Sequence, residues 1–514
     1  MEESEPSEHY RSHTGTQEFS KAGTRLDNDV CFMSATALIP EFRAGTLSPV
    51  EVLESQIARD LAHGAVINAF TERLHDEARE HARAAELRYR RAEPGEPLPQ
   101  LLGVTVATKE KHQIAGHRIE LGLLGHSRVI AEHNHPVVDR LRNAGAIIHA
   151  RTTTPEYSCA TVTHSLLWGT TRNPWNLEFS PGGSSGGAGA ALAAGFTTLA
   201  TASDIAGSTR LPAAFTGTVG YKAPAGRIPG DGPLAADWYR GDGPMGRTVA
   251  DVALLTNVLS GLHAGDAASI PGGPHIRTDS EATPRLRVAL SVDLGGYAVD
   301  ADVARHTRRI AELLAAAGHT VEEVNLQIRH DDVHRTAFTH FGNILGPAMQ
   351  EPVSRAGDVS AYTRRFLEDA ATQARRNTLY DSIEGEHRIQ QLLADVFTRF
   401  DLLICPTSAV AALDAAGDYL DGVSVDGTHL EHYWQAHMTL PFNIANRLPV
   451  LAVPSGISRF GIPTGVQLIG SPFAEQLVFS VGLEIERAER WDLKHPGTEL
   501  GNTSQPESSE GVTK

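Results

Sequence analysis

Residues 181–190 read PGGSSGGAGA, and a second Gly-Ser pair follows soon after, within SDIAGSTR at 203–210. A run of glycine and serine is usually a flexible linker or a loop that binds phosphate. A linker is disfavoured because this run continues directly into an Ala-rich stretch that is typical of a helix. A phosphate-binding loop is disfavoured because no lysine stands in the place that its pattern requires. The serines therefore indicate a third possibility, a catalytic loop.

Two serines in these stretches, Ser184 and Ser208, each follow a glycine. A serine hydroxyl is a poor nucleophile at neutral pH and needs a base. The sequence shows no evident pairing of either serine with a histidine, but Lys109 ends the strand-like, apolar run LLGVTVATK. Burial disfavours the ammonium form of a lysine, so a lysine in such a place can act as a neutral base. We therefore consider a site built from two serines and a lysine.

The rest of the chain has the pattern of an α/β protein. It has 514 residues, 41% of them hydrophobic, which is enough for a large core. Helical and strand-like patterns alternate between residues 28 and 494 without an evident linker, which favours a single α/β domain. The polar segments 1–27 and 495–514 are predicted to be disordered tails.

Charge and cysteine content exclude several classes of function. The formal net charge of −17 disfavours binding to nucleic acid or to an anionic membrane. The three cysteines are far apart and lack metal-ligand spacing, so we expect neither a disulfide framework nor a zinc site, and a reducing, cytoplasmic location. The N-terminus does not resemble a signal peptide, and no apolar run is long enough to span a membrane.

Several motifs, in order along the chain, resemble the amidase signature family. They are GVTVATKEKHQIAG, PGGSSGGAGAALAAG, SDIAGSTRLPAAFTGTVGYK, GPMGRTVADVALLTNVLSG, FDLLICPTSA and LPFNIANRLPVLAVPSG, and the resemblance covers roughly residues 32–490. It implies a large mixed β-sheet surrounded by helices, with residues 263–400 as a more variable flank near the active site. It also implies a small-molecule amide as substrate, no cofactor or metal, and a homodimer as a common state of such enzymes.

The resemblance assigns catalytic roles to the residues singled out above. It implies Ser208 as the nucleophile that forms an acyl-enzyme, Ser184 as the bridging acid/base, and Lys109 as the general base. It further implies a cis peptide bond between Gly183 and Ser184. The remaining implied site residues are an oxyanion hole made by the backbone N–H groups of Ile205, Ala206, Gly207 and Ser208, and supporting positions at Gly183, Ser185, Asp204 and Arg210, of which the last two are expected to form an ion pair.

Two positions depart from the family pattern, and a third lies next to one of them. Ala206 stands where many relatives have glycine, and Glu110 stands where the family usually has aspartate. Lys111 follows, and if this segment is extended, its side chain shares a face with Lys109 and lowers the pKa of that lysine. The alternative is that Lys111 points to solvent.

Other functions remain open at this stage. The same machinery could cleave esters, transfer the acyl group to an amine in a biosynthetic pathway, or serve as the glutaminase subunit of a tRNA-dependent amidotransferase. A non-catalytic binding protein is a further alternative. Several residues near the motifs are interpreted as ordinary packing in preference to substrate contacts: Thr163, His164, Trp168, Trp238, Tyr239, His340 and Trp434.

Overall fold

One mixed β-sheet runs through the protein. The computed structural model describes residues 30–126, 129–279, 283–491 and 494–496. The sheet has 11 strands in the order β1-β5-β2-β8-β10-β9-β16-β17-β13-β11-β12. Their bounds are β1 Phe70–Arg73, β2 Thr105–Lys109, β5 Ile147–Thr152, β8 Leu199–Asp204, β9 Val219–Lys222, β10 Gly241–Gly246, β11 Arg287–Leu290, β12 Thr320–Glu323, β13 Leu402–Pro406, β16 Val450–Ile457 and β17 Pro463–Gly470.

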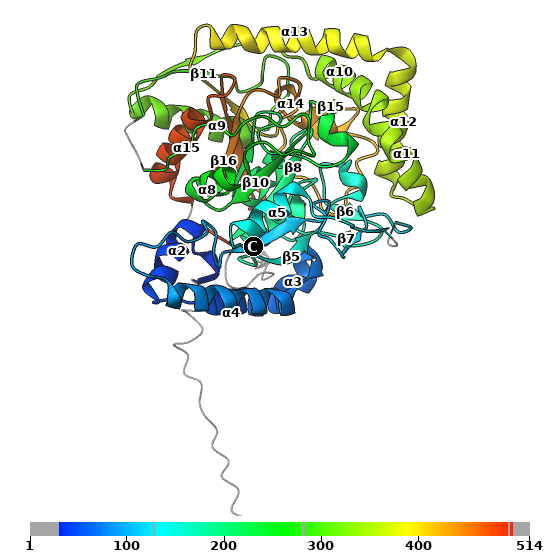
Figure 1. Ribbon diagram of the computed structural model, residues 1–514. Helices are drawn as coiled ribbons and strands as arrows, with labels where there is room; N and C mark the ends of the chain where they lie inside the picture. The colour runs from blue at the N-terminus through cyan, green and yellow to red at the C-terminus, as the bar shows by residue number, and fades with distance from the viewer. Residues whose placement is uncertain (1–29, 127–128, 280–282, 492–493, 497–514) are drawn as a thin grey trace, which may run out of the picture.

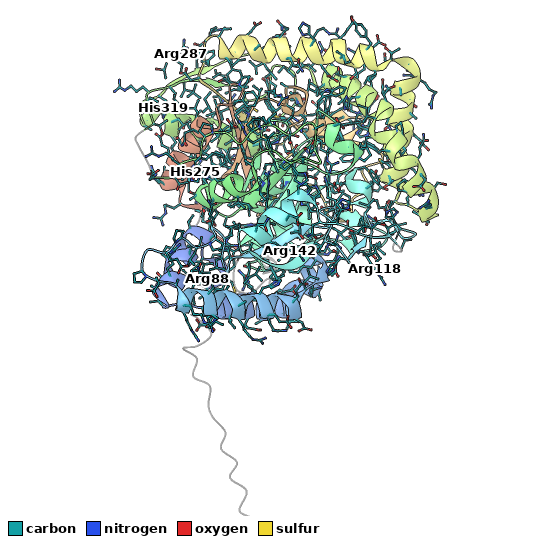
Figure 2. The ribbon with its side chains drawn as sticks, viewed as in Figure 1. Arg88, Arg118, Arg142, His275, Arg287 and His319 are labelled. Carbon is teal, nitrogen blue, oxygen red and sulfur yellow. The ribbon has the colours of Figure 1, made fainter. Side chains whose placement is uncertain are left out.

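Helices surround this sheet, which confirms the predicted fold class (Figure 1). The helices α2–α4 lie together at one end of the molecule, whereas α13 lies across the opposite end and α11 and α12 run down one side, so that α10–α13 form a helical layer over that end and side. Figure 2 shows Arg88 on α4 and Arg287 near the other end of the view. The bounds are α2 Ala35–Ala44, α3 Pro49–Ile67, α4 His75–Arg91, α5 Pro136–Asn143, α6 Gly186–Ala193, α7 Arg210–Thr216, α8 Val249–Leu259, α9 Ala301–Ala316, α10 His330–Asn343, α11 Leu345–Ala356, α12 Ala361–Arg376, α13 Leu379–Phe397, α14 Pro441–Ile444 and α15 Glu475–Glu489.

The strands β2 and β8 bring the predicted lysine and nucleophile segments to one edge of the sheet. They are parallel neighbours, and every residue of both is buried, which explains their apolar, unalternating sequence. Lys109 is the last residue of β2 and Asp204 is the last residue of β8. Because parallel strands end at the same edge, both residues lie there, and Gly241 of the antiparallel strand β10 pairs with Asp204.

The Gly-Ser run is the tightly packed entrance to helix α6, whose residues are all buried. A Cβ atom on Gly186 would lie 2.2 Å from Thr163 Oγ1, and one on Gly187 would lie 2.4 Å from Thr153 Oγ1. Only glycine therefore fits at these two positions. The small residues let the helix approach the neighbouring segments closely, as the sequence indicates.

The segment 263–400, predicted as a more variable flank near the active site, contributes both strands and helices to the fold. Its strands β11 and β12 extend the main sheet, where β11 pairs with β13. Its helices α10–α13 form the helical layer over one end and one side of the molecule in Figure 1. The predicted tail 1–27 lies outside the described residues, as do residues 497–514, whereas the ring of His495 stacks on Phe32 with 3.9 Å between centroids. Within the described residues, no helix is long and apolar enough to cross a membrane.

Candidate active site

Lys109 lies at the centre of a cluster of serine hydroxyls. Its Nζ is 2.7 Å from Ser184 Oγ, 2.9 Å from Ser185 Oγ and 3.0 Å from Ser203 Oγ, and its side chain is fully buried. Its backbone N–H donates to Thr201 Oγ1 at 2.9 Å, which anchors the end of β2 to β8. The predicted lysine and bridging serine are thus in direct contact.

The pKa of Lys109 is lowered to about 7, chiefly because burial removes the ammonium group from water. The nearby carboxylate of Asp242 acts in the opposite direction, and the positive charge of Arg240 lowers the pKa further. A substantial fraction of the lysine is therefore neutral at neutral pH, as a general base requires.

The two serine loops meet at a small cavity. The peptide bond between Gly183 and Ser184 is cis, as expected. The backbone N–H of Ser185 donates to the carbonyl of Ser208 at 3.2 Å, which ties the two loops together. Ser184 and Ser208 both line a cavity of about 170 Å³, whose other lining residues are Lys111, Leu121, Tyr157, Ser158, Ser203, Ile205, Leu234, Arg240 and Leu345.

Asp204 organises the turn that carries Ser208. Its carboxylate accepts hydrogen bonds from the N–H groups of Gly207 at 2.7 Å and Thr209 at 3.2 Å, and forms the expected ion pair with Arg210 at 2.9 Å. Asn443 Nδ2 donates to the same carboxylate at 2.8 Å. Burial alone would raise the pKa of Asp204, but Arg210 and these donors hold it well below its usual range. The turn is therefore fixed around a fully ionised carboxylate.

The four predicted oxyanion-hole amides differ in their hydrogen bonding. The Gly207 N–H is already engaged by Asp204, whereas no hydrogen bond is found for the amides of Ile205, Ala206 and Ser208 within the described part of the chain. Gly207 has a φ of +115°, and a Cβ there would lie 2.2 Å from Thr439 Oγ1. Ala206 is buried, and its carbonyl accepts from Thr439 Oγ1 at 2.6 Å. The turn thus tolerates a side chain at 206 but not at 207.

Comparison with known proteins shows the family of the chain. A family model described as Amidase matches residues 51–479. The chain belongs to the amidase signature family. It is therefore an amidase, an enzyme of the class that hydrolyses carbon–nitrogen bonds.

Individual relatives of this amidase align over nearly the whole chain. A 6-aminohexanoate-cyclic-dimer hydrolase from Paenarthrobacter ureafaciens is 31% identical over 506 residues, which covers 90% of this chain and 96% of the relative. An acylamidase from Rhodococcus erythropolis is 32% identical over 500 residues, covering 92% and 99%. The solved structure of a bacterial aryl acylamidase of the same family superposes with a TM-score of 0.81 at 26% identity, covering 90% of this chain and 97% of that one.

The amidase site contains residues that sequence reasoning missed. Ser203 contacts Lys109, and it alternates on β8 with Thr201, which also contacts Lys109. That two-residue spacing places both side chains on one face of the strand and could have identified Ser203. Tyr157, Arg240 and Leu345 come from three distant segments and carry no comparable signal.

The prediction for Lys111 is wrong in both of its forms. The strand β2 ends at Lys109, and the His112 N–H donates to the Lys109 carbonyl at 2.8 Å, so the following segment turns away from an extended path. Lys111 Nζ lies 3.2 Å from Asp242 Oδ1, and its side chain is 13% exposed. Lys111 therefore neither follows Lys109 on one strand face nor points freely into solvent.

Glu110 holds the segment that carries Leu121, a residue of the cavity lining. Its carboxylate accepts from the backbone N–H groups of Glu120 at 2.7 Å and Leu121 at 3.3 Å, and it lies 3.5 Å from Arg151. Burial raises the pKa of this carboxyl, against the effect of Arg151. The departure from aspartate at this position thus orders the loop that carries Leu121.

The aromatic residues interpreted as packing lie outside the cavity lining. Tyr239 and His340 stack with 3.8 Å between ring centroids and are both buried. Thr163 is also buried, and its hydroxyl donates to the Gly182 carbonyl at 2.8 Å, just ahead of the cis bond. None of these three residues lines the cavity.

One cluster near the site has the composition of a metal site. Side-chain atoms of His112, His135 and Asp242 lie within 4.8 Å of one another, and all three residues are buried. However, His135 Nδ1 accepts the Val137 N–H at 3.2 Å, which makes Nε2, 3.4 Å from Asp242 Oδ2, the proton-bearing nitrogen and not a free metal ligand. Lys111 also competes for the carboxylate. The donor set therefore fits a hydrogen-bonded network better than a divalent cation.

Proposed function

We propose that this enzyme hydrolyses the C–N bond of carboxylic amides through an acyl-enzyme on Ser208. Ser184 is the bridging acid/base and Lys109 the general base. The observation that carries the proposal is the 2.7 Å contact between Lys109 Nζ and Ser184 Oγ at a fully buried position. A neutral amine offers two N–H donors and one lone pair, so one of its three hydroxyl neighbours can donate to it.

In the first half of the reaction, Ser208 Oγ attacks the carbonyl carbon while its proton passes through Ser184 to Lys109. The carbonyl oxygen becomes an oxyanion that the free amides of Ile205, Ala206 and Ser208 stabilise. Each such donor is worth about 2.7–4 kcal/mol in the transition state. Because Gly207 already donates to Asp204, we assign it the role of shaping the turn in preference to that of a direct oxyanion donor.

Acylation is complete when the proton returns through Ser184 to the leaving nitrogen and the C–N bond breaks. In the second half, water attacks the acyl-enzyme and gives a proton to the relay. The relay passes that proton to Ser208 Oγ as the bond between this oxygen and the acyl carbon breaks, which releases the carboxylic acid. The aliphatic and aromatic side chains of Leu121, Tyr157 and Leu345 reduce the water content of the cavity, which strengthens these charge interactions.

The proposal also includes the class of substrate, the location and the oligomeric state. The substrate is a small-molecule amide, and the location is cytoplasmic with a homodimer as the proposed state. Ester cleavage or acyl transfer to an amine remains the alternative that uses the same residues. Comparing the turnover of an amide with that of its ester, with and without an added amine, distinguishes the three.

Covalent labelling with a fluorophosphonate, followed by peptide mapping, tests the nucleophile. We expect an adduct on Ser208 in the wild type and none in Ser208→Ala. Ser158→Ala is the matched control, since Ser158 lines the same cavity and has no proposed role in the chemistry. An adduct on Ser158, or on no residue of a folded protein, would refute the assignment.

A further inference from the structure

Two cations line the catalytic cavity, Lys111 and Arg240, and they differ in their partners. Lys111 is neutralised by Asp242, at 3.2 Å. The guanidinium of Arg240 makes no ion pair or hydrogen bond with any residue in the described ranges. Only its backbone is held, through its N–H to Asp237 at 3.0 Å and its carbonyl to Asn446 at 3.4 Å. Among the residues that the structure describes, the cavity lining therefore contains one positive charge without an anionic partner.

The position of Arg240 places that charge close to the reacting groups. It immediately precedes β10, whose first residue, Gly241, pairs with Asp204 at the base of the nucleophile turn. Its charge is felt by Lys109, whose pKa it helps to lower. Arg240 is only partly exposed, and its apolar neighbours in the lining include Leu234 and Ile205. In such surroundings a planar guanidinium is well suited to hold a carboxylate through two parallel hydrogen bonds.

We propose that Arg240 binds a carboxylate of the substrate, so that the preferred substrates are amides that carry a carboxylate a short distance from the scissile carbonyl. This inference rests on the proposed function of Ser208. One unpaired cation among the described lining residues of a cavity of about 170 Å³ matches a single negative charge on a small molecule. Because the protein as a whole carries −17, a dedicated cation is needed to attract an anionic substrate into the site.

The carboxylate can belong to either side of the scissile bond. On the acyl side, the substrate is a monoamide of a dicarboxylic acid, and on the amine side it is an N-acyl amino acid. Both kinds of substrate place a carboxylate near Arg240. Two separate substrate series distinguish the acyl-side carboxylate from the amine-side carboxylate. The first series is dicarboxylic monoamides of increasing chain length against the fatty amides of equal length. The second is N-acyl amino acids against the corresponding N-acyl alkylamines.

The test compares kcat/KM for charged and neutral members within each series. In the wild type we expect the carboxylate to raise kcat/KM by about 10- to 100-fold in at least one series, the size of a hydrogen bond to a charged group. Arg240→Gln is expected to abolish that preference, mainly through KM, and Arg240→Lys to keep part of it. Lys111→Gln removes an equal charge from the same cavity and should retain the preference.

Three outcomes would overturn the inference. Equal turnover of charged and neutral members by the wild type, with Ser208 still labelled, would refute the carboxylate subsite and leave the proposed function standing. An equal loss of preference in Lys111→Gln would show that the preference for a carboxylate comes from the electrostatic potential of the whole cavity and not from Arg240. Failure to label Ser208 in the folded wild type would refute both proposals together.

Discussion

At the scale of single residues, we expect the buried amine of Lys109 to determine how activity depends on pH. Only its neutral form accepts a proton, and its pKa is about 7. We therefore expect kcat/KM to rise with pH through about 7 and to fall about tenfold per unit below it. The pH profile of kcat/KM for one uncharged amide measures this. A profile that is flat between about pH 5 and 9 would show that Lys109 is not the base.

Gly207 is the second residue whose identity the geometry demands. An alanine there would combine an unfavourable positive φ with a Cβ 2.2 Å from Thr439 Oγ1. We expect Gly207→Ala to displace the turn and to reduce both amide turnover and labelling of Ser208, by at least about tenfold, because small displacements of reacting groups are costly.

Gly241→Ala is the matched control for this substitution. Gly241 pairs with the same turn, its φ lies outside the left-handed region, and a Cβ there would meet no atom within 4 Å. Wild-type labelling of Gly241→Ala together with loss in Gly207→Ala would support the role of the turn. Full activity in Gly207→Ala would mean that the Thr439 side chain can move away and that the turn is less constrained than its contacts indicate.

At the scale of elements, the junction between β8 and α7 depends on the ion pair of Asp204 with Arg210. Both side chains are buried, so removing one charge leaves the other uncompensated. We expect Asp204→Asn to lower the free energy of unfolding by about 3–5 kcal/mol, measured by urea denaturation. Glu322→Gln, which breaks the exposed pair with Arg399, should change it by less than about 1 kcal/mol. Similar losses of unfolding free energy in both variants would show that burial does not determine how much the ion pair contributes to stability.

The sequence predicted the elements that carry the site better than it predicted the cavity around them. The segments of Lys109, Ser184 and Ser208 are continuous motifs, so a local pattern was enough to find them. Lys111 was misjudged because no signal showed that the chain turns directly after Lys109, where the His112 N–H donates back to the Lys109 carbonyl. Arg240 and Leu345 reach the cavity from segments far away in the sequence, and only tertiary packing brings them to the serines.

At the scale of the whole molecule, the helical layer α10–α13 shares its core with the main sheet. Phe338 and Phe366 of the layer belong to the same buried cluster as Leu403 of β13 and Ile469 of β17. We therefore expect the layer and the sheet to unfold together. Tryptophan fluorescence and far-ultraviolet circular dichroism should give coincident urea transitions. Two separated transitions would show that the layer is an independent unit.

The nucleophile turn is completed by parts of the chain that are far downstream of it. Arg210 donates to the Thr439 carbonyl at 3.0 Å, to Asn443 Oδ1 at 2.7 Å and to Gln467 Oε1 at 2.6 Å. During synthesis on the ribosome, Ser208 therefore emerges more than two hundred residues before the groups that lock its turn. We therefore expect a nascent or prematurely terminated chain to hold the three proposed catalytic side chains without their alignment, and hydrolase activity to begin only once translation has passed Gln467.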